Sequence, residues 1–375
     1  MQENKSSLKE IAALFLKLGS IAFGGPAAHI AMMEDEVVKK RKWMTHEHFL
    51  DLVGATNLIP GPNSTEMTMH VGHERGGWKG LIVAGSLFIL PAVLITGIFA
   101  WLYQKYGQLP NVEPFLYGIK PAVIAIIASA VYTLGKKALK STTLGVLGAL
   151  TLMATLLGVH EIVALFGCGL AGIILFWIRS QQNSANGFFP LLLIPAAAEL
   201  WAAHLKTFLI FLKVGALLYG SGYVLFAFLD AELVMKGLLT RQELIDAVAV
   251  GQFTPGPVLS TATFVGWQLG GFWGAVAATL GIFIPSFVFV AILNPIIPRL
   301  RKSKFMGAFL DAVNIAAVAV IVSVMVSMAA DTLTDWRTIV IALASLAVTF
   351  WHKKMNSAWI VVGGALLGYL LSMVG

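Results

Sequence analysis

Two stretches of the chain, Leu81 to Leu102 and Gly271 to Leu293, contain no charged side chain at all. A helix needs about 20 apolar residues to cross the ~30 Å hydrocarbon core of a bilayer, and both stretches are long enough. Eight further apolar runs carry at most one or two charges each: 11–33, 115–134, 142–159, 162–178, 207–229, 312–330, 338–351 and 358–374. The pattern predicts an all-α polytopic membrane protein.

Composition excludes the main alternatives. Hydrophobic residues make up 58% of the 375 residues and charged residues 12%, which excludes a soluble enzyme and a disordered chain. The net charge of +7 comes from basic residues in short loops between apolar runs, so it indicates membrane topology and no nucleic-acid partner. A single cysteine, Cys168, excludes an internal disulfide and a zinc site with several cysteines. No cofactor and no metal is expected.

The chain is a tandem duplication, because motifs of its first part recur in order in its second part. Phe15-Leu16-Lys17-Leu18-Gly19 recurs as Phe211-Leu212-Lys213-Val214-Gly215, and Pro60-Gly61-Pro62 as Pro255-Gly256-Pro257. Single residues match in the same order, with slippage of one residue between successive groups: Gly24, Asp51, Gly72, Gly76, Gly77, Gly80 and Pro91 with Gly220, Asp246, Gly266, Gly270, Gly271, Gly274 and Pro285. We expect repeats at 10–180 and 206–375, joined by a linker at 181–205.

Each Pro-Gly-Pro should stop one helix and start another, because proline removes a backbone donor and restricts the residue before it. Broken backbone inside a membrane must be enclosed by protein or line a cavity. We therefore interpret 47–72 and 242–266 as hairpins that enter and leave on one side. In the first half this interpretation gathers the loop lysines and arginines on one side, whereas in the second half the charges do not discriminate. By the positive-inside rule, the repeats then have inverted topology.

The number of crossings is less constrained by the sequence. Five crossings plus one hairpin per repeat, an odd number, would invert the second repeat without an extra helix. The linker would then lie along the membrane interface, and the alternative is that it forms a thirteenth crossing beside fully spanning hairpins. The range is 10 to 13 membrane segments.

Polar residues follow both Pro-Gly-Pro motifs. They are Asn63, Ser64, Thr65 and Glu66 in the first repeat, and Ser260, Thr261 and Thr263 in the second. A helix N-terminus offers unpaired N–H groups and about half a positive charge, so two such termini at Gly61 and Gly256 would make an anion cradle. The alternative is that these hydroxyls only cap their helices.

Lys17 and Lys213 stand at the same repeat position inside apolar runs. A lysine in a membrane segment is costly and normally faces the protein interior, which favours a role on the substrate path, although either side chain could instead snorkel to the interface. Lys120, before Pro121, is a weaker candidate because Asn314 aligns with it.

Glycine-rich turns follow the two lysines: Gly24 and Gly25 in the first repeat, and Gly220, Ser221 and Gly222 in the second. They permit either close helix packing or a broken helix with exposed N–H groups near the substrate.

Three acids could carry a proton: Glu66, and the matched pair Asp51 and Asp246, which stand nine residues before each Pro-Gly-Pro. The matched pair could equally form ion pairs near loops. Four further acids end the first helix of each half and are expected to be solvated: Glu34, Glu36, Asp230 and Glu232.

These motifs carry a resemblance. The stretches NLIPGPNSTEM, GWKGLIVAGSLFILPA, GSGYVLFAFL and DAVAVGQFTPGPVLSTATFVG resemble the chromate ion transporter family in its long, two-domain bacterial form, over nearly the whole chain. The Phe23-Gly24-Gly25-Pro26 turn and Lys120-Pro121 belong to the resemblance. It implies a multi-pass protein of the bacterial inner membrane that exports chromate, a tetrahedral dianion similar to sulfate.

The resemblance leaves the physiological oxyanion open, whether chromate, sulfate or another. No nucleotide-binding motif is present, so uniport, proton coupling and anion exchange all remain, as does an anion channel. A metalloenzyme built on His70, His73 and Glu74 is the least favoured alternative, because HExxH is absent. The expected partners are the oxyanion and the lipid bilayer, and a homodimer is left open.

Overall fold

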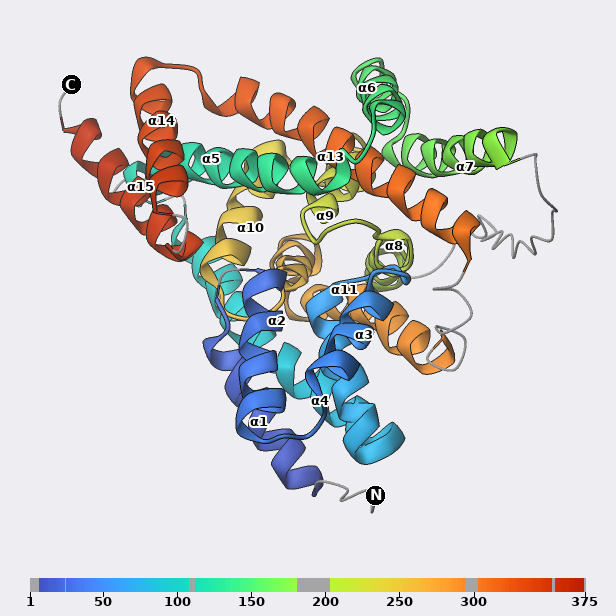
Figure 1. Ribbon diagram of the computed structural model, residues 1–375. Coiled ribbons are helices and arrows are strands. Elements are labelled where there is room, and N and C mark those ends of the chain that lie inside the picture. The colour runs from blue at the N-terminus through green and yellow to red at the C-terminus, as the bar shows by residue number, and fades with distance from the viewer. Residues whose placement is uncertain are drawn as a thin grey trace.

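The computed structural model describes residues 7–180 and 203–373, except 24, 108, 110, 111, 294–302, 353 and 354. The expected linker at 181–205 thus lies almost entirely outside the described residues. The described part is helical throughout and contains no strand, as predicted (Figure 1).

The two repeats have the same order of elements. The first contains α1 (Leu8–Ile21), α2 (Pro26–Glu34), the short π-helix η1 (Asp35–Lys40), α3 (His46–Thr56), α4 (Asn63–Tyr106), α5 (Glu113–Ala138), α6 (Thr142–Leu156) and α7 (Glu161–Ser180). The second contains α8 (Ala203–Leu217), α9 (Val224–Leu229), η2 (Asp230–Val234), α10 (Arg241–Phe253), η3 (Val258–Ser260), α11 (Thr261–Leu293), α13 (Lys304–Thr332), α14 (Trp336–Trp351) and α15 (Ser357–Ser372).

The prediction that 11–33 and 207–229 each form one crossing helix is wrong, and of the two readings of their glycine-rich turns the broken helix is observed. The first run breaks after Ile21, and its two halves lie antiparallel, because Arg41 beyond η1 reaches back to Glu10 near the start of α1 (3.4 Å). The second run breaks after Leu217. A glycine turn inside an apolar run thus ends the helix, although hydropathy continues across it.

A second break divides α4 at Gly77 and α11 at Gly270 and Gly271. Gly77 and Gly271 have φ of 58° and 60°, which only glycine adopts readily. The chain folds back there, since Gly72 lies against Gly80 and Gly266 against Gly274, so closely that a Cβ would collide with the opposite carbonyl. This close approach explains why these glycines match between the repeats.

The first Pro-Gly-Pro joins two antiparallel half-helices, α3 and the arm 63–76. Their far ends are in contact: His48 Nε2 lies 3.6 Å from Glu74 Oε2, and the Arg75 guanidinium lies 5.3 Å from the Trp43 ring centre. Thr45 caps α3, and the matching Thr240 caps α10 in a capping box. The outer end of the first hairpin therefore lies at Gly77, where the second part of α4, the arm 78–106, begins.

The arm 78–106 is about 43 Å long at 1.5 Å per residue, enough to cross a bilayer. Its other end contacts the second hairpin: Tyr103 donates to Asp246 on α10 (2.7 Å), and Gln104 accepts from Trp267 on α11 (2.8 Å). The outer ends of the two Pro-Gly-Pro hairpins therefore lie at opposite ends of this arm.

The remaining helices exchange partners between the repeats. The pair α6 and α7 packs on α13 of the second repeat, the pair α14 and α15 packs on α5 of the first, and α5 and α13 contact each other (Figure 1). Five described helices are long and apolar enough to span a membrane: Asn63–Tyr106, Glu113–Ala138, Glu161–Ile178, Val258–Ile292 and Lys304–Thr332. Three shorter apolar helices, α6, α14 and α15, accompany them.

Candidate functional site

The two Pro-Gly-Pro loops are bonded across the interface between the repeats. The Gly61 amide donates to the carbonyl of Leu218, in the first break of the second repeat (2.7 Å). Reciprocally, the Gly256 amide donates to the carbonyl of Ala22, in the first break of the first repeat (2.8 Å). The first break of each repeat is thus bonded to the Pro-Gly-Pro break of the other repeat, which brings the glycine-rich turns to the Pro-Gly-Pro loops.

Both central glycines have backbone angles that other residues rarely adopt, with φ of 138° at Gly61 and 91° at Gly256. Among the turn glycines, Gly25 and Gly220 also have positive φ, of 82° and 93°. Gly222 lies beside the second Pro-Gly-Pro helix, near Leu259. Gly24 lies outside the described residues.

The polar residues after Pro-Gly-Pro are only partly available to a ligand. The Thr65 and Glu66 amides donate to the Pro62 carbonyl, and the Asn63 amide group donates to Asn57. In the second repeat the Ser260 amide donates to Pro257, and the Thr261 hydroxyl to the Val258 carbonyl. Each helix start keeps its N1 and N2 amides outside these bonds.

A hydroxyl cluster that we did not predict spans the interface between the repeats. The Thr96 hydroxyl, from the arm 78–106, lies 3.2 Å from the Ser260 hydroxyl and 3.4 Å from the Thr254 hydroxyl, either of which can accept its hydrogen bond. All three residues are buried. Thr96 is the only hydroxyl in the charge-free run after Pro91, which could have singled it out. Ser221, in contrast, caps its own turn by accepting from the Tyr223 amide.

Glu66 is fully buried at the first Pro-Gly-Pro. Neither of its carboxyl oxygens has a hydrogen-bond partner among the described residues. A Cβ on Gly61 would collide with Glu66 Oε1 and lie 2.6 Å from the hydroxyl of Ser286, from the second repeat. Nearby, His29 Nδ1 lies 3.2 Å from the Ser64 hydroxyl. The sequence did not single out His29 or Ser286, which have no matching polar residue in the other repeat.

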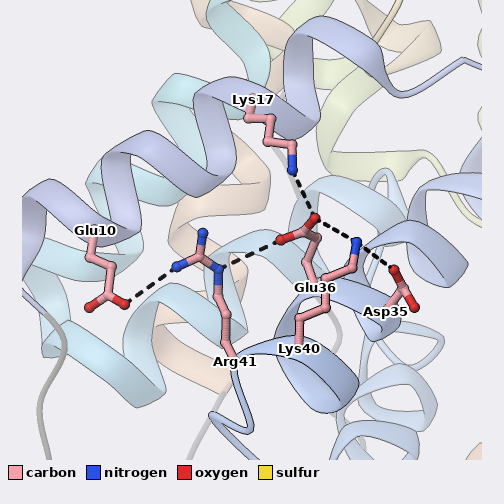
Figure 2. A network of polar contacts seen from close by, with 6 residues as sticks. All are labelled: Glu10, Lys17, Asp35, Glu36, Lys40 and Arg41. Atoms are coloured by element: carbon pink, nitrogen blue, oxygen red, sulfur yellow. Dashed lines mark hydrogen bonds and ion pairs between the residues drawn. The ribbon is translucent and has the colours of Figure 1, made fainter.

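Lys17 and Lys213 form the same ion pair in both repeats. Lys17 Nζ lies 2.8 Å from Glu36, and Figure 2 shows that Lys40 and Arg41 converge on the same carboxylate. Glu10 and Asp35 complete this network. Lys213 Nζ lies 2.5 Å from Glu232, which also contacts Lys236 and His160. A role of the two lysines on the substrate path stays a prediction.

The expectation that the acids ending the first helices are solvated is wrong for three of the four. Side-chain exposure is 10% for Glu36, 2% for Glu232 and 6% for Asp230. The reason is the helix break, since the returning half-helix buries these carboxylates against α1 or α8, which a single straight helix would not do.

The lysines hold these carboxylates ionised. The hydrogen bond from Lys17 keeps the pKa of Glu36 below its ordinary value. Burial acts to raise the pKa of Glu232, but the hydrogen bonds from Lys213 and Lys236 outweigh it, and the pKa is lowered. A carboxylate whose pKa is lower in the folded state than in the unfolded state stabilises the fold at pH values above its unfolded-state pKa. This stability is lost as the pH falls through the folded-state pKa.

We therefore expect Glu232→Gln to lower the stability in detergent by about 1–2 kcal/mol, since its lysine partners are half exposed. Glu36→Gln should cost about 1 kcal/mol or less, because Glu36 is less buried. Thermal melting between pH 7 and pH ~4, the ordinary range of a glutamate, measures both effects, and each variant should lose part of the acid sensitivity. Equal melting temperatures of Glu232→Gln and the unsubstituted protein would contradict the stabilising role.

The matched acids differ between the two ends of the molecule. Asp246 is 3% exposed, accepts from Tyr103, and lies 3.5 Å from Lys120 on α5, which also donates to Gln242. Asp51 is exposed on α3. Of the two expectations for Asp246, the pairing of its carboxylate is therefore observed.

This difference extends to whole helices. α10 packs against α5, α13 and α15, whereas the main contacts of α3 are with α2 and α4. Arg241, at the start of α10, binds Asp230 (2.9 Å) and reaches Asp331 on α13 (3.1 Å). Its counterpart His46 lies 3.1 Å from Glu34, the counterpart of Asp230. The end of the molecule at α10 is therefore packed more extensively than the end at α3, by contacts within the second repeat and by the cross-repeat contact of α10 with α5.

Comparison with known proteins identifies a family with this duplicated architecture. The chromate transporter family matches twice, at residues 9–173 and 205–369. A probable chromate transport protein of Synechococcus elongatus is 32% identical, over 97% of this chain and 95% of its own length. Chromate transport proteins of Cupriavidus metallidurans and Pseudomonas aeruginosa are each 30% identical, over 96% and 97% of this chain and 92% of their own lengths.

No solved structure matches the chain. The relatives are transport proteins and not enzymes, and the apolar helices are those of a multi-pass membrane protein. With both repeats matched and nearly the whole length covered, the chain belongs to the chromate transporter family.

Proposed function

We propose that this protein is a secondary transporter that exports chromate from the cytoplasm and binds it between the two repeats, at the Pro-Gly-Pro breaks. The observation that carries the proposal is the crossed pair of hydrogen bonds, Gly61 to Leu218 and Gly256 to Ala22. Through them, the Pro-Gly-Pro loop of each repeat, which precedes a helix N-terminus, is joined to the first break of the other repeat. The interface between repeats is where secondary transporters with repeated folds bind their substrates.

The chemistry of the interface suits a tetrahedral oxyanion. The amides of the first two residues of the arm 63–76 and of η3, which stand outside the hydrogen bonds of these helix starts, lie at the positive ends of their helices. Ser64, Thr65, Ser260 and Thr261 would add hydroxyl donors, together with Thr96 of the cross-repeat cluster. Four oxygens of a dianion require several donors from different directions, which two opposed helix starts provide.

The positions of the hairpins support inverted repeats. Their outer ends lie at opposite ends of the arm 78–106, so they would enter the membrane from opposite sides. Lysines and arginines cluster at the first hairpin's end: Lys39, Lys40, Arg41, Lys42, Arg75 and Lys79. By the positive-inside rule that end is cytoplasmic, and the membrane is the bacterial inner membrane.

The unequal packing of the two ends supports alternating access. Eight of the 13 residues of α10 are buried, whereas only four of the 11 residues of α3 are, so the site would be closed more tightly toward the outside than toward the cytoplasm. Because the repeats share their elements, a movement that packs α2 and α3 as α9 and α10 are packed now would give the opposite state. Chromate would enter in the present state and leave in the other.

Export needs no nucleotide. A charge that crosses 100 mV changes its free energy by about 2.3 kcal/mol, so a dianion that leaves an inside-negative cell gains about 4.6 kcal/mol per 100 mV. The membrane potential alone is a sufficient driving force.

Reconstitution into proteoliposomes tests the function. We expect chromate uptake that saturates with concentration, accelerates with an inside-positive potential, and is inhibited by sulfate less strongly than by unlabelled chromate. Equal inhibition would make the protein a general oxyanion carrier. A flux that rises linearly with chromate concentration would indicate a channel, and the absence of flux above that of empty liposomes would refute the proposal.

A further inference from the structure

We propose that Glu66 is the proton-binding residue of the transport cycle: its carboxyl must be protonated before the oxyanion binds at the first Pro-Gly-Pro, so one proton accompanies each anion. This inference rests on the proposed function, because it assumes an anionic substrate at that loop. It assigns the proton to one of the three acids and predicts its stoichiometry.

The first observation is the isolation of the carboxyl group. Glu66 is 0% exposed, and both of its oxygens lack a hydrogen-bond partner among the described residues. An unpaired carboxylate buried in this way is unstable as an ion, whereas a neutral carboxylic acid is tolerated. The other two candidates differ: Asp246 is paired with Lys120 and Tyr103, and Asp51 is exposed.

The second observation is the place of the carboxyl. It fills the space beside Gly61, together with the hydroxyl of Ser286, which is itself buried and without a partner in the described part of the chain. Gly61 belongs to the first repeat and Ser286 to the second. The carboxyl therefore lies at the interface between the repeats, on the first turn of the helix whose N-terminus would hold the anion.

Among the described residues, no hydrogen bond or ion pair joins a cation to Glu66. The helix α11 carries no charged residue, and Lys17 and Lys213 on α1 and α8 are bound to Glu36 and Glu232. The titratable groups on the neighbouring elements are His29 on α2, Tyr219 in the break before α9, and His70 one turn further along the same helix.

The second repeat has no such acid. In the Pro-Gly-Pro register, Thr261 takes the place of Glu66, and its hydroxyl donates to the Val258 carbonyl. A residue needed only to start the helix would be expected in both copies. The acid is confined to one of two equivalent helix starts, which supports a single proton site in each molecule.

Binding of a dianion next to Glu66 links the two ligands. A dianion and an ionised carboxylate repel each other in a shared site, so protonation of Glu66 strengthens binding of the anion. By reciprocity, bound anion strengthens binding of the proton. One linked proton weakens anion binding roughly tenfold per pH unit above the pH at which Glu66 titrates. The complex that crosses the membrane then carries one net negative charge in place of two.

The test compares the full-length protein with Glu66→Gln in proteoliposomes that contain a pH-sensitive dye. We expect chromate flux by the unsubstituted protein to move protons with the anion, and its apparent KM to rise with pH. Glu66→Gln should transport chromate without moving protons and lose the protein's share of the pH dependence. Chromate itself takes up a proton in mildly acidic solution, and since this is common to both proteins, the difference between the two profiles reports Glu66.

Two further variants keep the test decisive. Glu66→Asp retains an acid and should retain proton movement, which separates loss of the proton from loss of the fold. Asp51→Asn, at the matched exposed acid, should keep the pH dependence of the unsubstituted protein. Chromate flux without proton movement in the unsubstituted protein, or proton movement by Glu66→Gln, overturns the inference and leaves the proposed function intact. Absence of chromate flux at every pH overturns the proposed function itself.

Discussion

Valine in place of Gly256 is expected to reduce chromate transport by roughly tenfold or more, since positive-φ strain and overpacking each cost about 1–3 kcal/mol. Gly256 has φ of 91°. A Cβ there would lie 3.0 Å from Ala92 Cβ and 3.3 Å from the carbonyl oxygen of Gly19. The latter is backbone and cannot rotate away, so the loop must shift and take its amide from Ala22.

Gly61→Val should have an equally large effect for a different reason. Its added side chain would displace Glu66 and Ser286, which are side chains and can move, but which belong to the proposed site. Transport in proteoliposomes, normalised to the folded protein recovered, measures both variants.

Gly237→Ala is the matched control. Gly237 also has a positive φ, of 68°, but a Cβ there has no neighbour within 4 Å. The control should lose about 1 kcal/mol of stability from the strained backbone and keep its transport rate. Intact transport by folded Gly256→Val and Gly61→Val would mean that the Pro-Gly-Pro loops are structural kinks only.

Reversal of the charge at Arg241 is expected to abolish transport by opening the closed end of the molecule. Arg241 binds Asp230 and Asp331, so Arg241→Glu would place three acids together and repel α10 from α13. Loss of one partner of a fully buried ion pair costs about 3–5 kcal/mol. The cost here is smaller, because Asp331 is partly exposed. Alternating access fails when one of the two closures cannot form.

Two variants test the specificity of this effect. Asp331→Arg combined with Arg241→Glu restores an attraction between α10 and α13 and should recover part of the transport. His46→Glu, at the matching position of α3, should have a smaller effect, because His46 is more exposed than Arg241 and its ion pair among the described residues is with Glu34 alone. Equal losses from His46→Glu and Arg241→Glu would contradict a gate located at the second repeat's end.

Local sequence signals were sufficient for the membrane class, the duplication and the Pro-Gly-Pro breaks. Charge-free runs report that a segment is buried in lipid or protein, and proline interrupts a helix wherever it falls in such a context. The crossed hydrogen bonds join each of these loops to the first break of the other repeat, and the anion cradle between the two loops stays a prediction. The polar residues that follow each Pro-Gly-Pro lie at the start of a helix, because the proline ends the preceding helix there.

Continuous hydropathy led to a wrong prediction at the first break of each repeat. The runs 11–33 and 207–229 remain hydrophobic through their glycine turns, and hydropathy does not distinguish one long helix from two antiparallel halves. The halves are held by Lys17 with Glu36 and Lys213 with Glu232, pairs nineteen residues apart. No helical spacing relates such residues, so the buried carboxylates could not be recognised.

The sequence by itself determined which segments are apolar, that the backbone must break at each Pro-Gly-Pro, and that the two halves are equivalent. Only the tertiary structure decided which member of each matched pair is buried. Asp51 and Asp246 are the same residue at the same repeat position, yet only Asp246 is enclosed, because α10 packs on α5 while α3 does not pack on α13 to the same degree. Burial of a side chain depends on surfaces contributed by distant segments, and two equivalent sequences can therefore have different surroundings when one end of the molecule is packed more tightly than the other.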